Sequence, residues 1–266
     1  MSVFATLFLM LIVILIAAEV FTNALEHLGE KLKISEGVTG SLFAAVGTAL
    51  PETMVPLLAI FAGTDDKHLN EEIGVGAILG APLMLITLSV SLLAFATFRK
   101  RTLSGHFTPE KTGFKRDINF FLFAFTLAAA AMFIPHDMPY LRIFIGGVQE
   151  ASTILGISAL MLSLLIIPIA TELPEKFNSI LWIRRHKDTM AFGNITGAMV
   201  FQGTLLPAIG ITLTPWTPRP EVLAGIVIAL VGALWLRFMI SYGQLRVWHV
   251  LVNGSLYVLF IAIALG

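Results

Sequence analysis

The chain contains no cysteine among its 266 residues. A disulfide framework, a thiolate metal site and a cysteine nucleophile are therefore all excluded. Charged residues are also scarce, since they make up only 13% of the sequence, and the formal net charge is zero. This balance gives no reason to expect nucleic acid or another polyanion as a partner. The sequence also lacks a nucleotide-binding glycine loop and a Gly-x-Ser-x-Gly motif.

Apolar sequence, by contrast, is abundant, because 57% of the residues are hydrophobic. The charges stand in short clusters between apolar runs long enough for the roughly 20 residues of a membrane-spanning helix. We therefore predict an all-α membrane protein without a separate soluble domain. No positively charged segment precedes the N-terminal apolar run, so we expect a first spanning helix rather than a cleaved signal peptide. Spans are predicted at about 3 to 22, 36 to 63, 73 to 98, 118 to 134, 154 to 184, 190 to 213, 221 to 241 and 246 to 265.

Loop charges predict the orientation of these segments, because Lys and Arg concentrate on the cytoplasmic side of a membrane. The loops from Arg99 to Arg116 and from Arg184 to Asp188 are basic and are both expected in the cytoplasm. The segment at 36 to 63 then runs outward and the segment at 154 to 184 runs inward, as in inverted repeats. The stretch from Met138 to Thr153 is too short to cross twice. Eight spans plus this non-crossing segment is therefore the favoured count.

A Pro-Glu pair occurs twice inside apolar segments. The two copies are Gly47-Thr48-Ala49-Leu50-Pro51-Glu52 and Ala170-Thr171-Glu172-Leu173-Pro174-Glu175. Carboxylates at membrane depth are rare and usually mark ion or proton pathways, because hydrocarbon does not solvate their charge. Since proline lacks an N–H group, Pro51 and Pro174 should break or kink their helices and free backbone carbonyls. Those carbonyls, the threonine hydroxyls and the two carboxylates are oxygen ligands of the kind that calcium takes.

A glycine-rich motif follows each Pro-Glu motif. The first carries Gly76 and Gly80, and the second carries Gly193 and Gly197. Glycines four residues apart let helix backbones approach closely, so ordinary helix packing would explain either pair alone. The same two motifs in the same order in both halves indicate a transporter built from two related halves. We place these halves at residues 1–135 and 136–266.

The two motifs together resemble the alpha repeats of the sodium/calcium exchanger family, in the cation/calcium antiporter superfamily. The resemblance covers about 36 to 90 and 154 to 208. It implies an inverted-repeat transporter bundle with two broken-helix alpha repeats and 8 to 10 membrane segments. By this resemblance Glu52 and Glu175 match the central ion-binding acids. Thr48 and Thr171 match ligands that bind through carbonyl and hydroxyl oxygens.

Several neutral oxygen ligands of that family are replaced in this chain. The replacements are Ala49 and Glu172 after the threonines, Ala81 and Ala198 in the glycine-rich helices, Ala77 at an asparagine position, and Leu85 and Gln202 at Asn or Asp positions. These losses argue against a cycle that carries several sodium ions. Asn194 and Gln202 are expected to add polar contacts. Glu172 is either a third acidic ligand or the ion-pair partner of Lys176, one helical turn away.

The predicted function is a secondary-active antiporter that exchanges calcium or a related cation for sodium or protons. We expect it in the cell membrane, plasma or inner, with small cations and the lipid bilayer as partners and with no cofactor. One alternative is an intramembrane enzyme that uses Glu52 and Glu175 as an acid/base pair on a lipid, but no nucleophile or metal ligand is visible beside them. A second alternative is a non-transporting sensor or scaffold that retains the fold.

Overall fold

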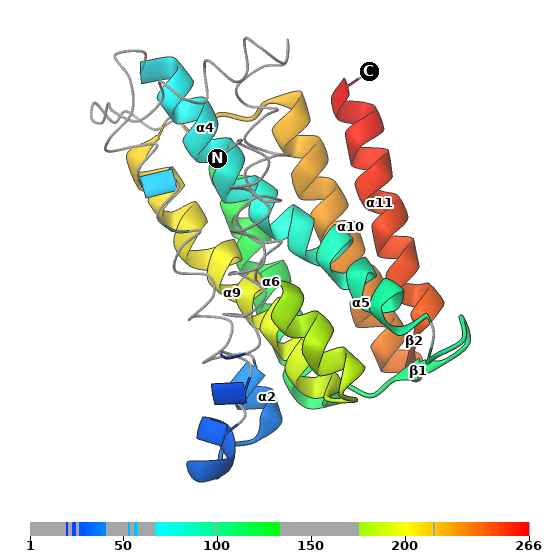
Figure 1. Ribbon diagram of the computed structural model, residues 1–266. Helices are drawn as coiled ribbons and strands as arrows, with labels where there is room; N and C mark the ends of the chain where they lie inside the picture. The colour runs from blue at the N-terminus through cyan, green and yellow to red at the C-terminus, as the bar shows by residue number, and fades with distance from the viewer. Residues whose placement is uncertain are drawn as a thin grey trace, which may run out of the picture.

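The computed structural model describes residues 20, 23, 24, 27–40, 53, 56, 57, 67–98, 100–133, 176–214 and 216–265. In this part the chain is mostly helical, and Figure 1 shows its long helices packed in a bundle. The described helices include α2 (Glu36–Val38), α4 (Lys67–Met84), the π-helix η2 (Leu85–Ser89), α5 (Val90–Thr97), α6 (Lys111–Ala131), α9 (Asp188–Leu213), α10 (Pro220–Tyr242) and α11 (Val247–Leu265). A further helical segment covers residues 176–184.

Two short strands depart from the all-α expectation. β1 (His106–Phe107) pairs antiparallel with β2 (Leu245–Arg246). Next to this pair, the backbone N–H of Val247 donates to the carbonyl of Gly105 at 3.0 Å. The predicted loop after residue 98 is therefore fastened to the start of α11. Its sequence gave no strand signal, because a two-residue strand is too short for an alternating pattern.

Four helices in the described part are long and apolar enough to cross a membrane: His68–Thr97, Asp188–Leu213, Pro220–Tyr242 and Val247–Ala264. They agree closely with the spans predicted at 73 to 98, 190 to 213, 221 to 241 and 246 to 265. The first begins earlier than predicted, because the helix continues through polar residues such as Asn70 that hydropathy assigns to a loop. α6 covers most of the predicted span at 118 to 134, ending at Ala131, but it begins with a polar turn and is not among the four. The spans predicted at 3 to 22, 36 to 63 and 154 to 184 lie wholly or largely outside the described residues.

The first of these helices contains an irregularity in its middle. Pro82 lies inside α4, and the π-helix η2 begins three residues later. A π-helix shifts the hydrogen-bond register by one residue, which leaves a carbonyl without its usual helical partner. The carbonyl of Ile86 accepts a hydrogen bond from Asn253 Nδ2 of α11 at 2.7 Å, and the same amide donates to Gly232 of α10 at 3.2 Å. One buried asparagine thus joins η2, α10 and α11.

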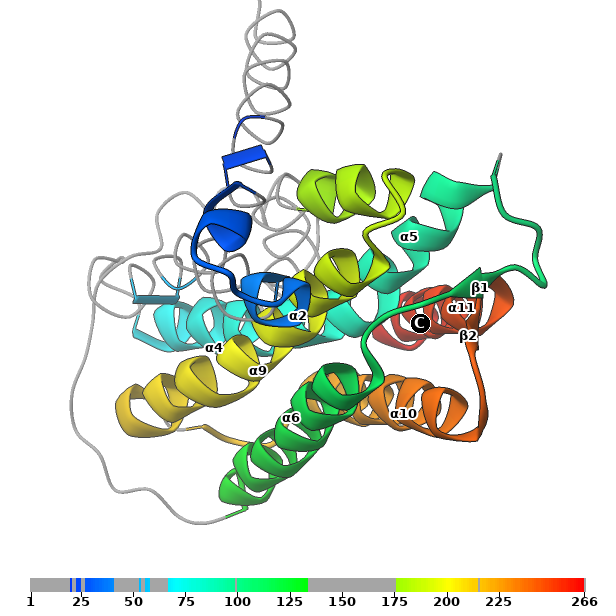
Figure 2. The same cartoon turned by 90° about the horizontal axis from the view of Figure 1, so that it is seen from below.

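The two basic loops meet at one end of the bundle, which we call the basic end. Lys100 Nζ donates to the carbonyl of Arg184 at 3.0 Å. α2 and both strands lie at this end, at the bottom of Figure 1 and facing the viewer in Figure 2. At the opposite end, Arg219 before α10 pairs with Glu72 of α4. The described helices therefore run in the relative directions that the loop charges predicted.

A buried ion pair holds the loop after α5 against the first residue of α9. Arg101 donates to both carboxylate oxygens of Asp188 at 2.7 Å, and the two side chains are only 11% and 2% exposed. The backbone N–H of Thr108 donates to the same carboxylate at 2.8 Å. A bidentate ion pair between Arg and a carboxylate is strong and has a defined geometry, and a carboxylate at a helix N-terminus also interacts favourably with the helix dipole. The pair therefore fixes the position of α9 at the basic end.

We predict that Arg101→Met lowers the melting temperature of the detergent-solubilised protein by about 6 to 10 °C. The variant leaves a buried carboxylate unpaired, which costs about 3 kcal/mol or more in unfolding free energy. Arg184→Met is the matched control, because Arg184 is exposed and its side chain has no ion pair in the described part of the chain. The double variant Arg101→Met/Asp188→Asn should recover part of the loss. Equal melting temperatures for the parent and Arg101→Met would contradict the stabilising role.

Candidate ion-binding site

The centre of the predicted site lies outside the described residues. This holds for the carboxylates Glu52, Glu172 and Glu175, the threonines Thr48 and Thr171, and the prolines Pro51 and Pro174. Their chain neighbours Thr53 and Lys176 are described, and they are only 8% and 1% exposed. The structure therefore shows the frame that adjoins the two Pro-Glu motifs, and the roles of the motif residues themselves stay predictions.

The two glycine-rich motifs lie on helices that pack against each other, α4 and α9. Gly76, Gly80 and Gly197 are buried, and Gly193 is half-buried. Farther along α9, a Cβ atom at Gly203 would lie 2.6 Å from Phe121 of α6, a distance that real Cβ atoms essentially never show. Small residues therefore bring α9 close to a neighbouring helix, as expected where helices pack in lipid.

Asn194 is fully buried on α9 and connects this helix to the segment that follows the second Pro-Glu motif. Its Nδ2 donates to the hydroxyl of Ser179 at 3.0 Å, and that hydroxyl donates to the carbonyl of Ala191 at 3.2 Å. Asn194 thus positions the helical segment that begins at Lys176. Sequence reasoning missed Ser179, although its place four residues after Glu175 was a usable signal, since residues four apart share a helix face.

Gln202 differs from Asn194, the other buried amide side chain of α9. It is 0% exposed, and neither its Oε1 nor its Nε2 forms a hydrogen bond with any residue in the described part of the chain. Leaving a buried amide unpaired costs about 1 to 3 kcal/mol, so a residue kept in that state calls for a functional explanation. An amide oxygen is one of the ligand types that calcium takes, and the role of Gln202 beside the ion stays a prediction.

Lys176 is a second unusual group, because lysine is almost never fully buried unless its charge is paired. Its side chain is among the largest fully buried ones in the described part of the molecule. The acids Glu172 and Glu175 stand four residues and one residue before it in the sequence. Burial of a cation so close to two acids favours an electrostatic role at the site, which hydropathy alone did not reveal.

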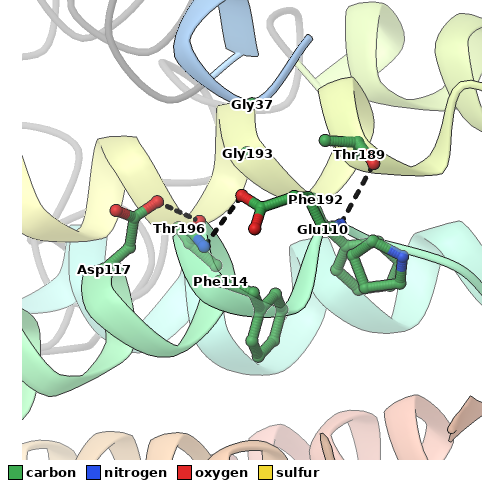
Figure 3. A pocket seen from close by; sticks show the side chains of 10 residues that line it. Gly37, Glu110, Phe114, Asp117, Thr189, Phe192, Gly193 and Thr196 are labelled. Atoms are coloured by element: carbon green, nitrogen blue, oxygen red, sulfur yellow. Dashed lines mark hydrogen bonds between the residues drawn. The ribbon is translucent and has the colours of Figure 1, made fainter. Parts of the chain in front are cut away.

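A small pocket beside Gly193 also contains acidic side chains, but it does not resemble a cation site (Figure 3). Asp117 accepts a hydrogen bond from Thr196 Oγ1 at 2.9 Å and also pairs with Arg116. Glu110 caps α6 by accepting from the backbone N–H groups of Thr112 and Gly113 at 2.9 and 2.8 Å. Both carboxylates are thus engaged in holding helices. Across the described ranges, no group of three or more His, Cys, Asp or Glu side chains could hold a metal ion.

Comparison with known proteins decides the family. Residues 2–142 and 138–266 match the profile of the family described as sodium/calcium exchanger protein. The chain belongs to this family. It is therefore an integral membrane cation antiporter of the exchanger type and not an enzyme, so the predicted function is confirmed and the lipid-directed enzyme alternative is wrong.

Two relatives illustrate the range of the similarity. The candidate antiporter CaxA of Alkalimonas amylolytica is 24% identical, over 79% of this chain and 81% of its own length. Sodium/potassium/calcium exchanger 1 of Bos taurus is 28% identical over 46% of this chain, which is only 9% of the bovine protein. The similarity to the bovine exchanger is therefore confined to a small part of that much longer protein.

Solved structures of exchangers share the fold. The sodium-calcium exchanger NCX_Mj, soaked with sodium and calcium, superposes with a TM-score of 0.73 at 17% identity, covering 98% of this chain and 99% of its own. The H+/Ca2+ exchanger CAX gives a TM-score of 0.67 at 20% identity, covering 95% of this chain and 79% of its own. At these identities the likeness shows a common fold.

We predict that Gln202→Leu lowers the rate of calcium uptake into proteoliposomes by about tenfold, the effect of losing roughly 1.4 kcal/mol of ion binding. Its melting temperature should stay unchanged or rise, because an apolar side chain removes an unpaired buried amide. Asn194→Leu should instead lower the melting temperature, since it deprives Ser179 of its hydrogen-bond donor. Gln244→Leu, at an exposed turn, is the control for the amide-to-leucine change. Normal uptake by Gln202→Leu would exclude Gln202 as a ligand.

Proposed function

We propose that the protein is a calcium antiporter in which Glu52 and Glu175 bind the transported ion. One observation carries this proposal: the family profile matches both parts of the chain, residues 2–142 and 138–266, and each part contains one Pro-Glu motif inside an apolar segment. Two carboxylates balance the charge of one divalent ion. Oxygen ligands from Thr48 and Thr171 would complete the coordination that calcium prefers.

The proposed architecture consists of two inverted halves, at residues 1–135 and 136–266, with 8 to 10 membrane segments. The directions of the described helices support it, because α4 and α10 run toward the basic end, whereas α6, α9 and α11 run away from it. Inverted halves place one broken helix from each repeat near the bilayer midplane, where an ion can be reached from either side in turn. We place the protein in the plasma or inner cell membrane, with its basic end in the cytoplasm.

Protons are the proposed coupling ion. Replacement of family ligands by Ala77, Ala81 and Ala198 leaves few neutral oxygens for several sodium ions, and all three alanines are buried in the structure. Two carboxylates about 4 Å apart repel each other by roughly 4 kcal/mol at an effective dielectric constant near 20. Uptake of a proton relieves this repulsion when calcium leaves. Glu172 would add a third carboxylate, and Lys176 would offset part of the negative charge.

Glu52→Gln and Glu175→Gln should each abolish calcium exchange in proteoliposomes, because the loss of one carboxylate unbalances the charge around a divalent ion. Both variants should still purify as folded protein with circular dichroism typical of helices. Glu36→Gln removes an exposed carboxylate at the start of α2 and should transport like the parent. Parent-like transport by both site variants would rule out the proposed site, and absence of transport by the parent itself would favour the non-transporting sensor.

Calcium binding should weaken as the pH falls from about 8 to about 6, because protons compete for the same carboxylates. An outward proton gradient should drive calcium uptake at least as well as a sodium gradient. The measurement is calcium uptake under each gradient separately, with an ionophore that collapses the proton gradient as the control. Strict dependence on sodium, with no effect of pH, would disprove proton coupling and leave the exchanger assignment intact.

Cysteine labelling can test the membrane orientation, since the chain has no native cysteine. Ser104→Cys and Arg184→Cys are exposed at the basic end, and Thr217→Cys is exposed at the opposite end. We expect a membrane-impermeant maleimide added to intact cells to label Thr217→Cys alone, with the other two labelled only after lysis. Labelling of the first two variants in intact cells would reverse the proposed orientation.

A further inference from the structure

Cations from two helices line an open cavity of about 460 Å³ at the basic end, where α6 begins and α10 ends. We call this cavity the basic pocket. Its charged lining consists of Lys111, Lys115, Arg116 and Arg237, and no acidic residue lines it within the described ranges. Four cations without a lining acid create a positive potential that attracts an anion.

Most of this charge is not neutralised by the protein. Arg116 pairs with Asp117, with Nε and a terminal nitrogen 3.2 and 3.1 Å from the same carboxylate oxygen. Lys111 and Lys115 have no ion pair within the described part of the chain. Arg237 donates to two neutral groups, the side-chain oxygen of Asn119 at 2.8 Å and the hydroxyl of Ser241. Three cations are therefore left for a ligand.

Arg237 has an unusual place in its helix. α10 is apolar from Val222 to Tyr242 except for this one charged residue. A charged side chain in a membrane helix is costly unless it reaches the interface or pairs with an anion. The link from Arg237 to Asn119 of α6 directs its guanidinium to the start of α6, where the polar turn of that helix meets its apolar stretch. A boundary between polar and apolar sequence in a membrane helix is expected at the depth of the lipid head groups.

The surface next to the basic pocket is strongly apolar. A second cavity, of about 620 Å³, also includes Arg237 but is otherwise lined almost entirely by apolar and aromatic residues of α10, such as Leu234 and Phe238. On α6, Phe120, Phe123 and Leu127 are 59%, 67% and 55% exposed. Their spacing of three and four residues places them on one face of the helix. Arg237 thus stands at the boundary between a cationic cavity and an apolar one.

We propose that the basic pocket binds the head group of an anionic phospholipid, with its acyl chains along the exposed apolar faces of α6 and α10. Basic pockets between membrane helices attract anionic head groups because phosphate pairs with Lys and Arg while the chains stay in hydrocarbon. The apolar second cavity favours a lipid over a free anion, because a free anion would make no use of it. This inference does not depend on which ion the antiporter carries.

Native mass spectrometry of the full-length protein, with equal amounts of phosphatidylglycerol and phosphatidylcholine in detergent, tests the proposal. The parent should retain about tenfold more phosphatidylglycerol than phosphatidylcholine, since each basic residue contributes separately to the attraction. The triple variant Lys111→Gln/Lys115→Gln/Arg237→Gln should lose that preference. The control triple Lys31→Gln/Arg184→Gln/Arg246→Gln removes the same charge from exposed sites elsewhere and should keep it.

Melting temperatures of both triple variants show whether they fold. If the pocket triple is unstable, the double variant Lys111→Gln/Lys115→Gln is measured in its place, because it keeps the contacts of Arg237. Glycerol phosphate, which has the head-group phosphate without chains, should bind at least about tenfold more weakly than the lipid. Equal loss of preference in both triples would show attraction by overall charge and overturn the site. The proposal would also be overturned if the pocket triple kept its preference for phosphatidylglycerol, or if glycerol phosphate bound as tightly as the lipid.

Discussion

Hydrocarbon offers no hydrogen bonds, so each polar group that the chain brings into the bundle needs a partner within the protein. The described helices meet this requirement at a few fixed points. Asn253 satisfies the carbonyl of Ile86 in the π-helix, and Asn194 bonds to Ser179 between α9 and the segment that begins at residue 176. The first bond joins helices that are 167 residues apart in the sequence, and the second joins two consecutive helical segments. The polar residues of the bundle therefore decide how its helices are arranged.

Gln202 differs from Asn194 and Asn253, since neither atom of its buried amide group forms a hydrogen bond with a residue that the structure describes. Gln202 lies on α9 two turns beyond Asn194, so one helix carries two residues with different roles. Asn194 holds a neighbouring segment in position, and Gln202 keeps an oxygen free. An exchanger needs both properties, because an ion must bind to groups that are held in place and must leave again when the opposite side opens. The burial of Lys176 adds a fixed positive charge next to the second Pro-Glu motif.

The basic end combines structural and surface roles. Asp188, Arg101 and Thr108 form a closed network in which every charge has a partner. The nearby basic pocket contains cations that the protein leaves unpaired. The ion-pair network around Asp188 stabilises the fold, whereas the unpaired cations of the basic pocket are suited to bind an anion from outside the protein. The same loop charges that orient the chain in the membrane can thus also attach it to anionic lipid.

Hydropathy and loop charge determined much of this protein from the sequence alone: the spans of α9, α10 and α11, the relative directions of the helices, and, with the paired motifs, the exchanger family. These features follow from local sequence, because whether a segment enters the membrane depends on the composition of that segment and of the loops beside it. Tertiary structure alone decided that Asp188 pairs with Arg101, that Asn194 binds Ser179 and that Gln202 has no hydrogen-bond partner among the described residues. Such outcomes depend on which side chains packing brings together across tens of residues, and a local pattern carries no information about that.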